Sequence, residues 1–180
     1  MINIQAQNVE KAKKILWMAP DKIAQAAARA INRTATHVQA KSSQTIRKTY
    51  TINAKSAKRK MKKRRANKNH LVATIVCAGQ PFLLTKFKTE NNKEGPIKVK
   101  VKKKSTLKPV KGLFIGKSKK NYSGPMLRER RSSYPLRIPY GPSLPAMFGS
   151  EDVVSIVEKS AENMLNDRFN HEVVEILRKL

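Results

Sequence analysis

This sequence holds little cysteine, few aromatic residues, few acids and no long apolar run, and each shortage excludes a class of protein. The single cysteine rules out a disulfide framework within the chain. Cys77 lies in the apolar run HLVATIVCAG, where we expect a buried, unreactive thiol. No apolar stretch approaches the ~20 residues that span a bilayer, and the first residues, MINIQAQNVEKAKK, lack the apolar core of a signal peptide. We therefore expect a cytoplasmic protein with no membrane segment.

Residues suited to catalysis or metal binding are equally sparse. Only three acids lie between Lys41 and Arg131, so paired carboxylates for acid–base chemistry are scarce there. The histidines fall in three separate segments, without the spacing of metal ligands: His37, His70 and His171. None of the HExxH, GxxxxGK[ST], GxGxxG or GxSxG motifs occurs. We predict that the protein is not an enzyme and uses neither a cofactor nor a metal ion.

Positive charge is abundant and concentrated in the middle of the chain. Lys and Arg number 39 against 12 Asp and Glu, giving a net charge of +27. From Lys41 to Arg131, 28 basic residues stand against three acidic ones, a net +25. Self-repulsion on this scale destabilises a compact protein until counter-charge arrives, and nucleic acid or anionic lipid usually supplies it. The composition therefore predicts a polyanionic partner.

The basic residues form two sets that we predict to act as one nucleic-acid-facing surface. The first is a run without any acid, and the second alternates with apolar residues in PIKVKVKKK. The surface comprises Lys55, Lys58, Arg59, Lys60, Lys62, Lys63, Arg64, Arg65, Lys68, Lys98, Lys100 and Lys102. Such runs are either solvated faces or footprints on phosphates, and their recurrence favours phosphate contact. Aromatics make up 6% of the chain and no zinc-finger, RRM or bZIP pattern occurs, so we do not expect base-specific recognition.

Helical periodicity dominates both ends of the chain. It predicts a short helix at residues 8–18 and one long Ala-rich helix at residues 21–49. The basic run at residues 54–63 is dense in helix-forming residues and predicts a second short helix. At the other end, Ser150 is a candidate N-cap for a long amphipathic helix over residues 150–180.

Strand patterns fill the middle. HLVATIVCAG and FLLTKFKT, separated by Gly79-Gln80-Pro81, predict a hairpin, and PIKVKVKKK predicts a half-buried strand with a lysine face. GLFIG and MLRERRSSYPLRIPYGPSLP add further strands. The predicted fold is α+β, with long N-terminal and C-terminal helices flanking a small antiparallel sheet. We expect one domain over residues 1–180: a helical part with a basic arm at 1–63, the sheet at 70–140 and the C-terminal helix at 150–180.

The proline-rich stretch YPLRIPYGPSLPAMF, residues 134–148, resembles the YPI…GPSVPxMF segment of the minor tail protein Z family of tailed bacteriophages, whose members are also called tail completion proteins. Collinear segments extend the resemblance over about residues 24–177. They are AAARAINRTA, IRKTYTINAKSAKRKM, LVATIVCAG, PFLLTKFK, IKVKVKK and GLFIG. One departure is KSKKNYSGPMLRERR, where the family pattern is richer in Gly and His. The family-like positions are Asn32, Arg33, Tyr134, Pro135, Gly141, Pro142, Pro145 and Phe148.

The resemblance implies a non-catalytic virion protein at the head-proximal end of the tail, assembled in the cytoplasm of the host bacterium. It implies other tail and neck proteins as partners (tail terminator or tube, and connector), the end of the phage DNA, and a homo-oligomeric ring matching the sixfold tail. The basic surface would then face either DNA or an acidic neck protein. The alternative is a free, sequence-nonspecific nucleic-acid-binding protein of the ribosomal-protein kind. Composition alone would favour it, but the apolar C-terminal helix that carries most of the acids, the scarcity of aromatics and the proline-rich stretch favour the tail protein.

Overall fold

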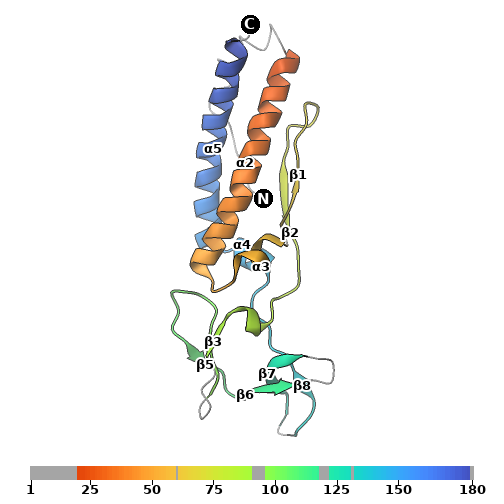
Figure 1. Cartoon of the computed structure of the whole chain (residues 1–180), viewed down its shortest axis with the longest axis vertical. Coiled ribbons are helices and arrows are strands. Elements are labelled where there is room, and N and C mark those ends of the chain that lie inside the picture. The colour runs from red at the N-terminus through yellow and green to blue at the C-terminus, as the bar shows by residue number, and fades with distance from the viewer. Residues whose placement is uncertain (1–19, 60, 91–95, 118–121, 131, 179–180) are drawn as a thin grey trace. The chain divides into compact units, whose positions relative to one another are not determined.

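The fold is α+β, as predicted, with two long helices and three small antiparallel sheets where one sheet was expected (Figure 1). The computed structural model describes residues 20–59, 61–90, 96–117, 122–130 and 132–178; the helix expected at residues 8–18 lies outside these ranges. The chain divides into two compact units. Unit 1 comprises Met1–Thr45, Met61–Cys77 and Ser150–Leu180, and unit 2 comprises Ile46–Lys60 and Ala78–Gly149.

Two antiparallel helices form the body of unit 1. Helix α2 (Pro20–Thr49) matches the predicted long helix, and helix α5 (Glu151–Leu177) matches the predicted C-terminal one. Small residues such as Ala26 and Ala30 are fully buried on α2, so the neighbouring helix can approach closely. On α5, Val153, Val157 and Ala161 are fully buried at helical spacing. Ser150 stands at the N-cap of α5, and its carbonyl accepts the first backbone hydrogen bonds of the helix.

A hairpin completes unit 1, and it is not the predicted one. Strand β2 (Thr74–Cys77) pairs with β1 (Met61–Arg64), which comes from the basic run. The helix predicted at residues 54–63 is therefore shorter, ending as α3 (Ala54–Arg59) in unit 2. Helix propensity predicted the wrong state for residues 61–63 because the half-buried strand β2 needs a partner, and the aliphatic stem of a lysine can lie along an apolar face. The hairpin predicted around Gly79-Gln80-Pro81 is wrong, and that turn signal lies just past the boundary between the units.

Unit 2 contains the other two sheets. Strands β3 (Lys88–Glu90), β4 (Lys98–Lys100) and β5 (Lys108–Pro109) form one, in that order. Strands β6 (Leu113–Lys117), β7 (Ser123–Arg128) and β8 (Leu136–Arg137) form the other. Much of FLLTKFKT is not a strand, because the 3-10 helix η1 (Leu84–Lys86) interrupts it before β3. Helix α4 (Leu144–Phe148) ends the unit.

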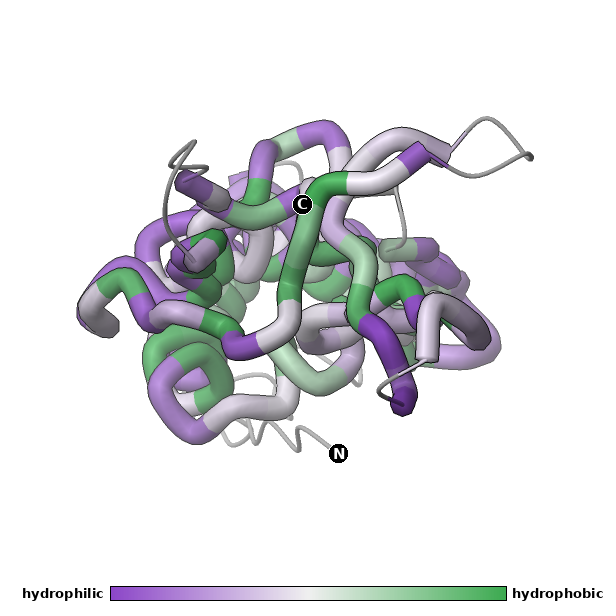
Figure 2. Tube along the Cα trace, turned by 90° about the horizontal axis from the view of Figure 1, so that it is seen from below, coloured by the Kyte–Doolittle hydropathy of each residue, from purple (hydrophilic) through white to green (hydrophobic). Residues whose placement is uncertain are grey.

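Apolar residues occur in short stretches throughout the described ranges. Figure 2 shows these green stretches alternating with purple hydrophilic ones along the trace. Within the same ranges, none of the helices combines the length and the apolar character needed to cross a bilayer. The cores are accordingly built from separated contacts, such as the edge-to-face pair of Phe82 and Phe87 in unit 2, whose ring centroids are 6.5 Å apart.

Candidate nucleic-acid interface

The predicted basic surface is divided between the two units. Five of its residues lie on the hairpin of unit 1: Lys62, Lys63, Arg64, Arg65 and Lys68. Four others lie in unit 2: Lys55, Lys98, Lys100 and Lys102. The side chains of Lys58 and Arg59, and the whole of Lys60, lie outside the described part of the chain. The structure therefore brings together one basic cluster, on the segment Met61–Cys77, which we call the basic hairpin.

Helix α2 holds the basic hairpin through three side chains on one helical face. The Asn32 side chain makes two hydrogen bonds to the backbone of Ala66: its Nδ2 donates to the carbonyl and its Oδ1 accepts from the N–H, both at 2.9 Å. One turn later, Thr36 Oγ1 accepts from the ammonium group of Lys63. Gln39 Nε2 then donates to the Met61 carbonyl at 3.1 Å. In Figure 1 the yellow hairpin accordingly runs beside α2.

The Asn32 contact falls where the strand ladder is interrupted. The register pairs Met61 with Cys77 and continues to Arg64 opposite Thr74. The next bridge joins Asn67 to His70 and is separate from the ladder, with two residues on one side and three on the other lying between them. Ala66 lies in this interval, and the Asn32 amide takes the place of a partner strand for its backbone. Asn67 Oδ1 accepts from the N–H of His70 at 2.7 Å and so closes the tip.

The two faces of the basic hairpin differ in exposure. Directly opposed residues share a face of a two-stranded sheet. The pairs Met61–Cys77 and Lys63–Ile75 are buried or half-buried, whereas Lys62–Val76 and Arg64–Thr74 are exposed. Arg65 and Lys68 at the tip are exposed as well. We call Lys62, Arg64, Thr74 and Val76 the outer face.

Among the described residues, no acidic side chain forms an ion pair with a cation of the basic hairpin. The sequence contains no Asp or Glu from Lys22 to Thr89. The ion pairs found in the described ranges join Arg29 and Arg33 to Glu172, Lys88 to Glu90, and Arg178 to Glu175. None of them involves a residue of the hairpin. Its positive field is therefore left for an external anion.

The lysines of unit 2 are partly engaged by their own unit. Lys98 and Lys100 are half-buried on β4, while Ile97 and Val99 are buried, so the predicted alternation of PIKVKVKKK is present. The ammonium of Lys102 lies 5.9 Å from the centre of the Tyr50 ring, a cation–π contact. These lysines form a second cationic region that belongs to unit 2.

The family-like residues of unit 1 connect its parts. Asn32 binds the basic hairpin, and its neighbour Arg33 faces the C-terminal helix. The buried carboxylate of Glu172 on α5 accepts from Arg29 Nε at 2.7 Å and lies 3.8 Å from an Arg33 guanidinium nitrogen. His37 and Ser160 add a hydrogen bond of 2.9 Å between the same helices. The segment AAARAINRTA therefore joins α2 to both the hairpin and α5.

The family-like residues of unit 2 form part of its scaffold. The Gly141 N–H donates to the Phe82 carbonyl at 2.7 Å, and the Phe82 N–H bonds the Pro142 carbonyl at 3.5 Å. A Cβ at Gly141 would lie 2.5 Å from the ring of Phe87, so no larger residue fits there without a shift. The proline-rich stretch then ends in α4, which Ser143 caps and in which Pro145 occupies the first turn. Tyr134 and Pro135 are exposed, and Phe148 is half-buried.

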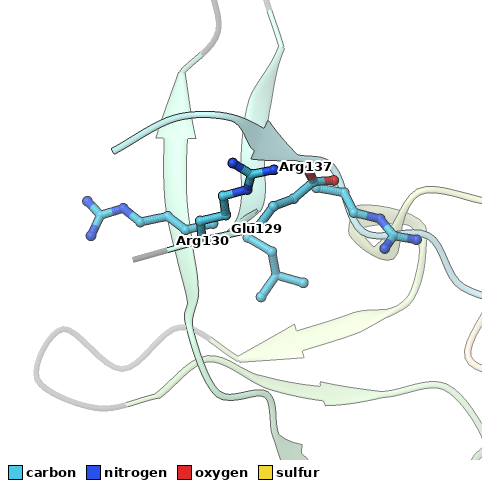
Figure 3. Close-up of a pocket in the computed structure, with 5 residues that line it drawn as sticks. Glu129, Arg130 and Arg137 are labelled. Carbon is cyan, nitrogen blue, oxygen red and sulfur yellow. The ribbon is translucent and has the colours of Figure 1, made fainter. Parts of the chain in front are cut away.

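Unit 2 also contains an open pocket of about 410 Å³ between β7 and β8 (Figure 3). Glu129 and Arg130 follow β7 and Arg137 comes from β8; Leu127 and Arg128 complete the lining. Its charged side chains are exposed, unlike the mostly apolar lining of small-molecule sites. Arg128 is engaged within the unit, 5.2 Å from the centre of the Phe114 ring.

Burial raises the pKa of the Cys77 thiol above 9.0, which makes the thiolate rarer at neutral pH. Cys77 lies on the inner face of the hairpin and is half-buried, where full burial was predicted. Among the residues with described positions, no group of three His, Cys, Asp or Glu could hold a metal ion.

Sequence reasoning missed Asn32 as the anchor of the hairpin, and it missed Thr74 and Val76 as parts of the exposed face. The one available signal was Asn32 itself, a weak helix former inside an Ala-rich helix. The local sequence of a strand contains no comparable signal of which other strand it pairs with. Neither a protein-family model, nor a curated protein, nor a solved structure matches the chain.

Proposed function

We propose that this chain is a structural, non-catalytic tail completion protein of a tailed bacteriophage. It acts at the head-proximal end of the tail, contributes to joining tail and head, and meets the phage DNA through its basic hairpin. Its partners are tail and neck proteins and further copies of itself, assembled into the virion in the host cytoplasm.

The collinear motifs that resemble the minor tail protein Z family carry this proposal. The structure supports it by giving those motifs specific contacts. Asn32 and Arg33 connect the three parts of unit 1, and Gly141 is required by the ring of Phe87 in unit 2. Residues that hold a fold together are the ones expected to recur among proteins that share it.

The unpaired cations of the basic hairpin support contact with a polyanion. Exposed Lys and Arg without acidic neighbours bind phosphates through charge and release of counterions, with strong salt dependence. DNA at the head–tail junction is such a partner. A free nucleic-acid-binding protein is the second candidate. An exposed basic hairpin would serve such a protein equally well, because phosphate binding does not depend on assembly into a virion.

Electron microscopy of particles from a strain lacking the gene tests the proposal. We expect filled heads and complete tails that remain separate, or that join without delivering DNA. Normal and fully infectious particles would overturn the tail role and leave the free nucleic-acid binder as the leading candidate.

Complementation of that strain tests the basic hairpin itself. The variant Lys62→Gln/Arg64→Gln/Arg65→Gln/Lys68→Gln should fold but yield fewer infectious particles. The matched control removes four exposed lysines of unit 2, Lys103→Gln/Lys104→Gln/Lys108→Gln/Lys111→Gln. Equal yields from the two variants would show that the hairpin has no special role.

A further inference from the structure

We infer that the outer face of the basic hairpin docks in the major groove of duplex DNA. The inference rests on the proposed function in taking DNA as the partner of the hairpin. It goes further by naming the form of the DNA, the groove and the residues that enter it.

The shape of the hairpin is the first argument. A two-stranded ribbon, with strands about 4.8 Å apart, is thin enough for the major groove, which is about 12 Å wide. Helix α2 holds the hairpin from the side of Ala66, Lys63 and Met61. The outer face is exposed, while α2 supports the hairpin through the backbone of Met61 and Ala66 and the side chain of Lys63.

The chemistry of the outer face is the second argument. Lys62 and Arg64 donate hydrogen bonds of the kind that guanine O6 and N7 accept in the major groove. Thr74 can exchange hydrogen bonds with base edges, and Val76, which is 39% exposed, offers an apolar contact for a thymine methyl group.

The tip of the hairpin complements this face. Arg65 and Lys68 are exposed at the end of the ribbon. With the ribbon in the groove, they would lie near the phosphates that line its edges. Leu71 and Val72 beside them are 43% and 53% exposed. Residues Met61–Cys77 contain no Phe, Tyr or Trp, whereas proteins that bind single strands rely on stacking by such side chains. Duplex DNA is therefore the form that fits this hairpin.

Binding of the purified full chain to fluorescent DNA tests the inference. The probes are a short duplex, its single strand, the same duplex with glucosylated 5-hydroxymethylcytosine, which fills the major groove, and the duplex with inosine for guanine, which changes the minor groove. We expect filling the major groove to weaken binding by about tenfold or more, and the inosine substitution to change it little. The single strand should bind more weakly than the duplex.

The variant Lys62→Gln/Arg64→Gln should bind the plain duplex about tenfold more weakly and should no longer distinguish it from the filled duplex. The control Lys103→Gln/Lys104→Gln loses the same charge in unit 2 and should keep that distinction. Circular dichroism should show both variants folded.

Several outcomes would overturn the inference: indifference to the filled groove, single-strand binding as tight as duplex binding, or tighter binding to anionic phosphatidylglycerol vesicles than to DNA. These results are separable from the proposed function. Unjoined tails in the deletion strain together with indifference to the groove would remove the inference and leave the function. Normal particles together with groove-dependent binding would remove the proposed function and leave the inference.

Discussion

At the scale of the residue, Asn32 ties the basic hairpin to α2 through two hydrogen bonds to Ala66. Its side-chain amide presents an N–H donor and a carbonyl acceptor side by side. It can therefore satisfy both backbone groups of Ala66 at the point where the strand ladder is broken. Without it, two part-buried polar groups would lose their partners, and Ala66 would no longer be bonded to α2.

We expect Asn32→Ala to lower the free energy of unfolding by about 2 kcal/mol, because an orphaned buried polar group costs roughly 1–3 kcal/mol. Denaturant unfolding followed by circular dichroism measures the change. Asn163→Ala, which removes an exposed amide from α5, is the matched control and should be nearly neutral. Equal effects of the two substitutions would contradict the role given to Asn32.

Cys77 provides a residue-scale prediction of pH dependence. Its pKa lies above 9.0 in the folded protein because burial disfavours the thiolate. The unfolded chain therefore loses this proton first as the pH rises, and the contribution of Cys77 to stability falls above about pH 9. Alkylation by iodoacetamide, which requires the thiolate, should have its pH midpoint above 9.0 in buffer and a lower midpoint in urea. Identical midpoints would contradict the burial effect.

At the scale of the element, the long helices could be predicted and the strand partners could not. Helix α2 begins and ends within one residue of the predicted range 21–49, because helical periodicity is a local property of the sequence. Strand β2 was recognised as a strand, but its partner β1 lies in a lysine-rich run whose local propensity favours a helix. Pairing depends on contacts between distant residues, which a single sequence does not reveal.

The candidate site shows the same limit. The basic residues Lys62–Lys68 were predicted as a functional set from charge alone, and the structure places them on one hairpin. Charge alone also predicted that Lys98–Lys102 belong to the same surface. Those lysines lie in the other unit, and charge does not indicate to which unit a residue belongs. Exposure of Thr74 and Val76 followed only from the register of the strands.

The packing of the proline-rich stretch gives a prediction at this scale. We expect Gly141→Ala to destabilise unit 2 by about 1–3 kcal/mol, because the new methyl group would overlap the ring of Phe87. Phe87→Leu removes that ring, so the two substitutions together should cost less than the sum of their separate effects. Thermal unfolding of the four proteins of this double-mutant cycle measures the coupling. Additive effects would show that the two residues do not constrain each other.

At the scale of the whole molecule, charge is segregated along the chain. The middle carries a net +25, whereas α5 carries seven of the 12 acids. Among the described residues, the ion pairs that span distant parts of the chain both end on Glu172. Repulsion between like charges therefore outweighs attraction over much of the molecule.

Salt should consequently stabilise the isolated protein. Raising NaCl from about 0.05 M to about 0.5 M shortens the Debye length several-fold and screens this repulsion. We expect Tm to rise by about 3 °C, equivalent to about 1 kcal/mol for a chain of this length. Differential scanning fluorimetry measures it, and the Lys103→Gln/Lys104→Gln/Lys108→Gln/Lys111→Gln variant, with less repulsion, should respond less. A fall in Tm with salt would mean that ion pairs dominate.

The discontinuity of unit 1 affects the order in which the chain can fold as it is synthesised. Arg29 and Glu172, which join its two helices, are 143 positions apart. All of unit 2 leaves the ribosome before the first residue of α5, so unit 2 can form while unit 1 is still incomplete. Most of helix α2 is made before unit 2, which begins at Ile46, yet its packing partner α5 is made after unit 2. Unit 2 can therefore complete its fold before unit 1, although the first residues of unit 1 are translated earlier.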